Sequence, residues 1–233
     1  MKKIAAVILI FLAAIGGAVF LLSGNIDSLI RDAIADYGSA MTQAKVSVGA
    51  VKIAPVDGKG TIGELSIGNP AGFKTAYALK VARIDVDIDI ASVAKDVIVI
   101  RNIAVVAPDV IYEKGTAMTN FDAIQKNIAA YLGTADGKKG GKKLIVEQLT
   151  IRDAKAQASA AFMNGKTFSV PLPDITLKNI GRAKGGITPG DLGQEVVGAL
   201  KAKLAGAVSF DRLMKSTGEV LDKAGSAIKG MFK

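Results

Sequence analysis

The chain has 233 residues and a formal net charge of +9; 50% of its residues are hydrophobic, and 5% are aromatic. It contains no cysteine and no histidine, which excludes disulfide bonds, thiolate or imidazole catalysis, and metal sites built on Cys or His ligands. Tryptophan is absent too, so a core must be built from Ile, Val, Leu and Ala, and the length suits one domain of ordinary size.

An uncharged apolar run, residues 4–22, follows Lys2 and Lys3 at the N-terminus. As a helix it would be roughly 28 Å long, about the hydrocarbon thickness of a bilayer. A cleaved signal peptide and an uncleaved signal-anchor both fit, but the small residues that signal peptidase requires are not found at the end of the run. We therefore expect residues 1–24 to be a transmembrane signal-anchor, with both lysines in the cytoplasm and the rest of the chain exported.

An amphipathic helix is expected directly behind the anchor, with Asn25 as its N-cap, apolar residues at helical spacing over 26–37, and an end near Gly38. The run 46–53 then indicates a strand with a bulge at Gly49, where the alternation changes phase. Another strand is expected at 61–68, followed by the turn sequence Asn-Pro-Ala-Gly.

The clearest strand pattern in the chain begins at residue 83, where apolar and charged residues alternate strictly. One face carries Ile84, Val86, Ile88 and Ile90, and the other carries Arg83, Asp85, Asp87 and Asp89. This period of two is typical of a half-buried strand. A second apolar run, 97–106, ends before Pro108, which cannot donate to a strand ladder. Together they predict an antiparallel sheet with one apolar face, and the way that face is covered decides the function.

The second half of the chain repeats the order of strands followed by helices. Asn120 is expected to cap a helix at about 120–132, and amphipathic helices are expected at 192–204 and 210–232. Short strands are expected at 110–112, 144–152, 154–160, 168–172 and 175–180. The predicted fold class is therefore α+β and β-rich: a transmembrane helix, then a curved antiparallel sheet over 25–180, then C-terminal amphipathic helices over 181–233.

Two motifs could carry chemistry, and each has a simpler interpretation. The glycines of 58–63 match the dinucleotide pattern G-x-G-x-x-G, but a strand rather than a helix comes after them, which favours a hairpin turn. Asp85, Asp87 and Asp89 could hold a cation or act as paired acids. A straight strand cannot wrap around an ion, however, so we expect a solvated face paired with Arg101 or lysines. No metal, cofactor or catalytic residue is predicted.

Two basic stretches bear on partners. The lysines of 137–143 are interpreted as a solvated loop, with anionic lipid headgroups as the second interpretation, and nucleic acid is not expected as a partner. The last helix sets Phe210, Leu213, Leu221 and Ile228 against Lys215, Lys223 and Lys229. This pattern fits a lid packed on the sheet, and it also fits a helix on a membrane surface or a partner protein.

A series of motifs comes after the apolar N-terminus: IRDAIADYGS, VSVGAVKI, GKGTIGELSIGNPAGF, YALKVARIDVDIDIASV and DVIVIRNIAVVAPDVIYE. In this order, residues 25–113 resemble the N-terminal region of the AsmA-like family of bacterial envelope proteins. The later segments LTIRDAKAQ, PLPDITLKNIG and GGITPGDL are similar to the next part of the chain in compact relatives.

The resemblance implies an inner-membrane protein with a periplasmic β-rich domain. In larger relatives the sheet curls into a groove whose concave apolar face is associated with lipid chains, and the family is linked to glycerophospholipid traffic and outer-membrane homeostasis. This chain is a short, single-module version. Eight or nine strands span only about 40 Å, which is too little to bridge two membranes.

We therefore expect a single-pass inner-membrane protein, mostly periplasmic, that binds or helps to transfer lipid in outer-membrane biogenesis without catalysis. Its expected partners are glycerophospholipid, the inner membrane and other envelope proteins. The candidate lining of a lipid groove is Ile84, Val86, Ile88, Ile90, Ile98 and Ile100. The same residues fit a closed core beneath the helix at 26–37 equally well. The alternative function is an envelope scaffold that docks a membrane complex without carrying lipid.

Overall fold

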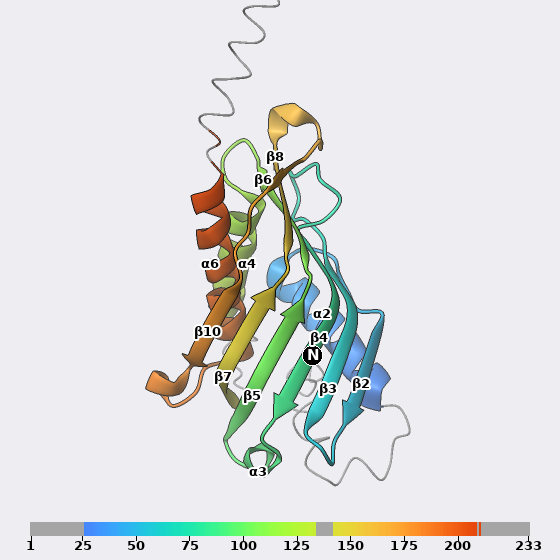
Figure 1. Ribbon diagram of the computed structural model, residues 1–233, viewed down its shortest axis with the longest axis vertical. Helices are drawn as coiled ribbons and strands as arrows, with labels where there is room; N and C mark the ends of the chain where they lie inside the picture. The colour runs from blue at the N-terminus through green and yellow to red at the C-terminus, as the bar shows by residue number, and fades with distance from the viewer. Residues whose placement is uncertain (1–25, 134–141, 209, 211–233) are drawn as a thin grey trace, which may run out of the picture.

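A computed structural model describes residues 26–133, 142–208 and 210. It has a β-rich α+β fold in which one open, curved sheet is covered on a single face (Figure 1). The α-helices of the described residues are α2 (Ile26–Thr42), α3 (Ile90–Val93), α4 (Asn120–Leu132) and α6 (Pro189–Ala207). The predicted anchor at 1–24, residues 137–141 of the lysine stretch 137–143 and the last helix beyond Phe210 lie outside the described residues. Of the same stretch, Lys142 donates to the Val93 carbonyl and Lys143 begins β7, so these two lysines do not belong to a solvated loop.

The sheet has ten strands but is only six strands wide. Eight of the strands lie end to end in four pairs, and each pair occupies one position across the sheet. In spatial order they are β1/β2, β3, β4, β5/β6, β7/β8 and β9/β10. Their bounds are β1 (Val46–Ser47), β2 (Ala50–Ala54), β3 (Lys59–Ile67), β4 (Leu79–Ile88), β5 (Val97–Val106), β6 (Asp109–Lys114), β7 (Lys143–Arg152), β8 (Lys155–Ala160), β9 (Phe168–Val170) and β10 (Ile175–Ile180).

The expectation of a purely antiparallel sheet was wrong. Strand β5 pairs with β7 in parallel, and β6 pairs with β8 in parallel, while the other pairings are antiparallel. The segment between β6 and β7 includes α4, so it is long enough to carry the chain back to the end of the sheet from which β5 started. Such a return is required for a parallel neighbour.

The interruptions lie close together in neighbouring strands and bend the sheet. Glu64, Ala107 and Asp153 each adopt a positive φ, of 55°, 46° and 54°. At each point the alternation changes phase, which increases the local twist of a strand. The predicted bulge at Gly49 is confirmed, since β1 ends before it and β2 begins after it. A Cβ on Gly49 would lie only 2.8 Å from the Cβ of Glu64, so the two irregular positions pack against each other.

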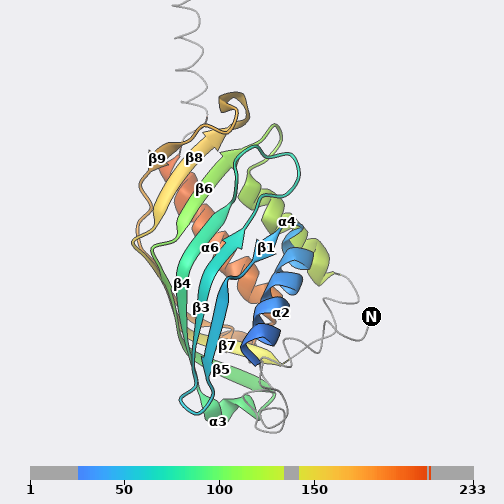
Figure 2. The same cartoon turned by 90° about the vertical axis from the view of Figure 1, so that its right-hand side faces the viewer.

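Helices α2, α4 and α6 all lie on the concave side of the sheet, and Figure 2 shows them together on that side. No long helix of the described residues covers the convex face, where Asp85 and Asp87 of β4 lie. Helix α4 contacts both of the others. Its Tyr131 ring meets the ring of Tyr37 in α2 edge-on, with centroids 5.5 Å apart, and its Asp122 pairs with Lys201 of α6 at 2.7 Å.

Three predicted boundaries were wrong for local reasons. Helix α2 continues past Gly38 to Thr42. A Cβ at Gly38 would lie 3.1 Å from a Val46 methyl, so this glycine permits close packing and does not end the helix. The N-cap of α4 is Thr119, in a capping box with Asp122. Strand β4 ends at Ile88, because Asp89 caps the short helix α3 by accepting a hydrogen bond from the Ala91 amide.

Candidate functional site

An apolar cavity of about 390 Å³ lies between the concave face of the sheet and the three long helices. It is partly open to solvent. Its walls come from the sheet (Leu65, Ile67, Ala78, Leu79, Val81, Ile84, Val105, Pro108, Leu149, Ile151), from α2 (Ile34, Met41, Thr42), from α4 (Phe121, Ile124, Ile128) and from α6 (Pro189, Leu192, Gly193, Val196, Val197, Leu200). This volume falls in the range of about 300–1,000 Å³ that is usual for ligand pockets.

The sheet wall is apolar because each change of phase returns the hydrophobic residues to the concave face. In β4, Val81 and Ile84 both line the cavity although they are three residues apart. In the β5/β6 strand, Val105 and Pro108 do the same across the left-handed residue Ala107. A strand with unbroken alternation would have turned one member of each pair towards solvent.

The helical wall depends on close packing of α6 against α4. A Cβ on Gly190 would lie 2.4 Å from a Leu132 methyl, so a larger residue here would require the Leu132 side chain to move. Gly193 faces both Met41 and Ile128, which would lie 3.5 and 4.0 Å from an added Cβ. The larger side chains of α6, such as Val196, therefore point towards the sheet and leave space in front of it.

Polar contacts at the edges hold the helices in this arrangement. Gln194 donates to the carbonyl of Gln125 at 2.8 Å, and Asn127 donates to the carbonyl of Thr42 at 2.8 Å. Burial alone would raise the pKa of Asp122, but hydrogen bonds from Lys201 and Thr119 outweigh it and hold that pKa below its ordinary value. The contacts fix the helices without placing a charge in the cavity.

The cavity offers little chemistry beyond its shape. Within the described part of the chain, Thr42 is the only polar residue in its lining, and its hydroxyl donates to the Gly38 carbonyl at 2.7 Å. The described residues also contain no cluster of three or more acidic, His or Cys side chains that could hold a metal ion. The arrangement can therefore hold an apolar chain by burial, and it places no acid, base or nucleophile against one.

The structure distributes the six candidate groove residues over three environments. Ile84 lines the cavity. Val86 and Ile88 line a small apolar hollow near the turn between β2 and β3. Ile90 lies in α3 and is 37% exposed, whereas Ile98 and Ile100 are buried in the core. Whether any of them touches lipid stays a prediction.

Most of the helical lining was not identified from the sequence. Val196 and Leu200 in α6, like Ile124 and Ile128 in α4, have the four-residue spacing of one helix face. That spacing indicates a buried face, but it does not distinguish a face against a packed core from a face against a cavity. The four-residue spacing therefore predicts that these helix faces are buried, but it does not predict that they line a cavity.

Two of the three aspartates, Asp87 and Asp89, pair with Arg101 as expected, whereas Asp85 pairs with Arg83 of its own strand. Arg101 contacts Asp87 at 2.9 Å and Asp89 at 3.5 Å. Asp85 is held at 2.8 Å by Arg83, whose hydrogen bonds lower its pKa. These pairs lie on the solvent face, opposite the cavity. Arg101 and Asp87 form a cross-strand pair between β5 and β4, whereas Arg83 and Asp85 lie two residues apart in β4.

A buried polar network lies beside the cavity, towards the end of the sheet where β4 begins. Glu113 is 1% exposed, and its carboxylate accepts from the amides of Lys74 and Thr75 and from the Thr75 hydroxyl, at 2.7–2.8 Å. Asn120 accepts from the Glu113 amide and donates to the side chain of Asn69. The network ties the Asn-Pro-Ala-Gly turn to β6 and α4, which the sequence alone did not indicate.

Comparisons with known proteins do not identify the chain. No family model, no curated protein and no solved structure matches it. No helix of the described residues is long and apolar enough to cross a membrane, and the run 4–22 lies outside them. The resemblance to the AsmA-like family therefore stays a prediction, and the cavity is the feature of the fold that bears most directly on function.

Proposed function

We propose that this protein binds an acyl chain of a membrane lipid in the cavity between the concave sheet face and helices α2, α4 and α6. The observation that carries the proposal is the combination of volume and lining: about 390 Å³ surrounded by apolar side chains. Because the cavity is partly open, its apolar walls face water when it is empty. Covering that apolar surface with an apolar ligand is favourable, which supports an occupant.

An acyl chain matches the lining better than a polar ligand. Each methylene buried contributes about 0.8 kcal/mol, so eight methylenes would contribute about 6 kcal/mol before the cost of ordering the chain. A polar ligand would need partners, and the single hydroxyl in the described lining, on Thr42, already donates to the Gly38 carbonyl. The role is therefore binding or transfer of lipid, without catalysis or a cofactor.

The proposed place is the bacterial envelope, with residues 1–24 in the inner membrane and the domain in the periplasm. The apolar run at 4–22 and the resemblance of residues 25–113 to the AsmA-like family support it. In that setting the lipid would be a glycerophospholipid, and the process would be outer-membrane biogenesis or homeostasis. A reporter enzyme active only in the periplasm, fused after Lys233, would be inactive if the chain stayed in the cytoplasm.

The binding proposal is tested by filling the cavity. The full chain is purified in mild detergent, and retained lipid is counted by native mass spectrometry. We expect Val196→Phe to lose retained lipid, because Val196 lines the cavity. The matched control is Val106→Phe on the solvent face of β5, where Val106 is 42% exposed. If the lipid is bound to the apolar N-terminus instead, the amount retained should be the same in both variants.

Two results would contradict the proposal. One is a chain that carries no lipid at all, which would favour the scaffold alternative. The other is equal lipid retention in Val196→Phe and Val106→Phe with both variants folded, which would place the lipid outside the cavity. Circular dichroism of each variant shows whether the fold is kept.

A further inference from the structure

Three loops meet at one end of the sheet, and we call this surface the tip. They span 69–76, 115–118 and 161–167, and they lie at the top of Figure 1. The Lys74 ammonium donates to the Ala161 carbonyl at 3.2 Å and to the Asn164 side chain at 2.7 Å. A Cβ on Gly115 would lie 3.0 Å from the Phe73 ring. The three loops therefore form one continuous surface.

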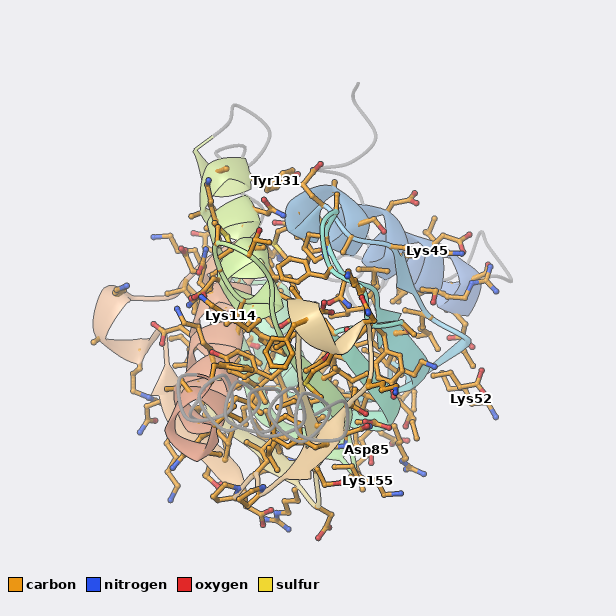
Figure 3. The ribbon with its side chains drawn as sticks, turned by 90° about the horizontal axis from the view of Figure 1, so that it is seen from above. Lys45, Lys52, Asp85, Lys114, Tyr131 and Lys155 are labelled. Carbon is orange, nitrogen blue, oxygen red and sulfur yellow. The ribbon has the colours of Figure 1, made fainter. Side chains whose placement is uncertain are left out.

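The charge of the tip is all of one sign. Lys74, Lys166 and the adjoining Lys114 are exposed or half-exposed, and none of the three loops contains an Asp or Glu. The carboxylates of the segments that adjoin loop 115–118 are already occupied. Glu113 is buried with hydrogen-bond donors on both oxygens, and Asp122 pairs with Lys201. Figure 3 looks onto this end of the molecule and labels Lys114.

An aromatic side chain stands among these lysines. Phe162 is 44% exposed and is the only aromatic residue among the large exposed hydrophobics of the described chain. It lies in the single turn Ala161–Met163, which Asn164 ends in the left-handed conformation with φ 50°. The Lys74 ammonium holds the turn through the Ala161 carbonyl, so the partly exposed ring is carried by an anchored turn.

We propose that the tip docks on an anionic lipid surface, with Phe162 entering the interface and the lysines facing the headgroups. A combination of cationic side chains and an apolar residue on one face is typical of proteins that bind such surfaces. Long lysine side chains can keep the ammonium in the headgroup layer while Phe162 lies deeper. A soluble acidic protein would match the charge, but it would leave the outward ring without an apolar partner unless it supplied a pocket.

The tip is remote from the start of α2, where the apolar N-terminus joins the domain. Strand β4 begins beside the tip at Leu79 and ends at Ile88, whose amide donates to the Gly58 carbonyl in the β2–β3 turn. Ten strand residues span about 33 Å, and Asp27 in the first turn of α2 accepts from the Ile53 amide at that far end. The docking surface thus lies at the opposite end of the sheet from the start of α2, and it does not depend on the lipid-binding proposal.

The absence of tryptophan from the chain makes the test direct. Phe162→Trp gives a single reporter, studied in the full chain held in a zwitterionic nanodisc. We expect its emission to shift to shorter wavelength when vesicles containing anionic phospholipid are added, and to stay unchanged with zwitterionic vesicles. Val106→Trp is the matched control, because Val106 is similarly exposed, at 42%, but lies on the side of the sheet.

The lysines are tested in the same reporter background. Each lysine that faces an anionic surface strengthens binding about fivefold, so Lys114→Gln with Lys166→Gln should weaken vesicle binding about 25-fold. Lys52→Gln with Lys178→Gln, both on exposed strand positions away from the tip, should change it less than twofold. The proposal would be overturned if the emission wavelength of Phe162→Trp did not change with anionic vesicles, or if Val106→Trp showed an equal shift. It would also be overturned if the two pairs of lysine substitutions weakened vesicle binding equally.

Discussion

The side chains on the concave face of the sheet are packed differently in its middle and towards the tip. Towards the tip, the Tyr112 ring lies between those of Phe121 and Phe210, with centroids 6.0 and 5.5 Å away. The same region holds the Glu113 and Asn120 network, and no buried side-chain N or O of the described residues lacks a partner. In the middle, Ile84 and Val196 face the cavity of about 390 Å³.

The difference shows that the cavity is not a consequence of a weak core. The chain fills one part of the concave face with aromatic rings and hydrogen bonds, and it leaves the adjoining part open under three well-anchored helices. Close packing of Gly190 against Leu132 and the Lys201–Asp122 pair hold those helices in place. Small-molecule sites are usually concave, mostly apolar and already formed in the free protein, and the cavity has this form.

The largest effect is expected at Glu113. Glu113→Ala removes the acceptor for one buried amide, one partly buried amide and one buried hydroxyl, and each buried donor left unsatisfied costs about 1–3 kcal/mol. We expect the free energy of unfolding to fall by about 3–5 kcal/mol, measured by denaturant titration in mild detergent. Glu147→Ala, which removes an exposed pair with Arg182, should cost less than about 1 kcal/mol. Equal costs would mean that the network does not stabilise the tip.

The second prediction compares a filled and an unfilled site on the same face. Ile98 is 0% exposed within the core, so Ile98→Ala should cost about 3–4 kcal/mol. Ile84 already faces open space, so Ile84→Ala loses fewer contacts and should cost only about 1 kcal/mol. Equal losses in a denaturant titration would indicate that the helices close over Ile84 in solution and that no cavity persists.

The third prediction adds volume to each region. Val196→Phe places a larger side chain in the cavity and should change the free energy of unfolding by less than about 1 kcal/mol. Ala158 is completely buried in β8, where no space is available. Ala158→Val should therefore cost about 1–3 kcal/mol through overpacking. Thermal unfolding of the two variants beside the parent chain separates the cases, and a larger loss in Val196→Phe would contradict the comparison.

The sheet was largely predictable because its signal is local. The alternation from Ile84 to Ile88, the bulge at Gly49 and the pairing of Arg101 with the aspartates result from a period of two and from charge complementarity. The parallel pairing of β5 with β7 was not predictable in this way. It depends on the path of the chain through α4, and strand composition does not encode that path.

The cavity and the network were not predictable, because both depend on long-range geometry. Asn120 was expected to be an N-cap, but its side chain contacts Asn69, 51 positions earlier in the chain. The residues that line the cavity share the hydrophobic character of those in the core. Ile84 differs from Ile98 in how far the helices lie from the sheet at each point, which no local pattern records.

The smallest effect concerns the pair that holds α6 on α4. The pKa of Asp122 is lower in the folded protein than its ordinary value of 3.8, so the unfolded chain binds this proton more readily. The contribution of the pair is therefore complete above the ordinary pKa and is lost as the pH falls through the lowered value. The Asp122–Lys201 pair contributes less than about 1 kcal/mol to the free energy of unfolding, because both side chains are partly exposed. Asp122→Asn should be destabilised at pH 7 and should lose less stability than the parent chain between about pH 5 and pH 2. Unfolding free energies with the same pH slope in both proteins would show that Lys201 does not secure the helix over the cavity.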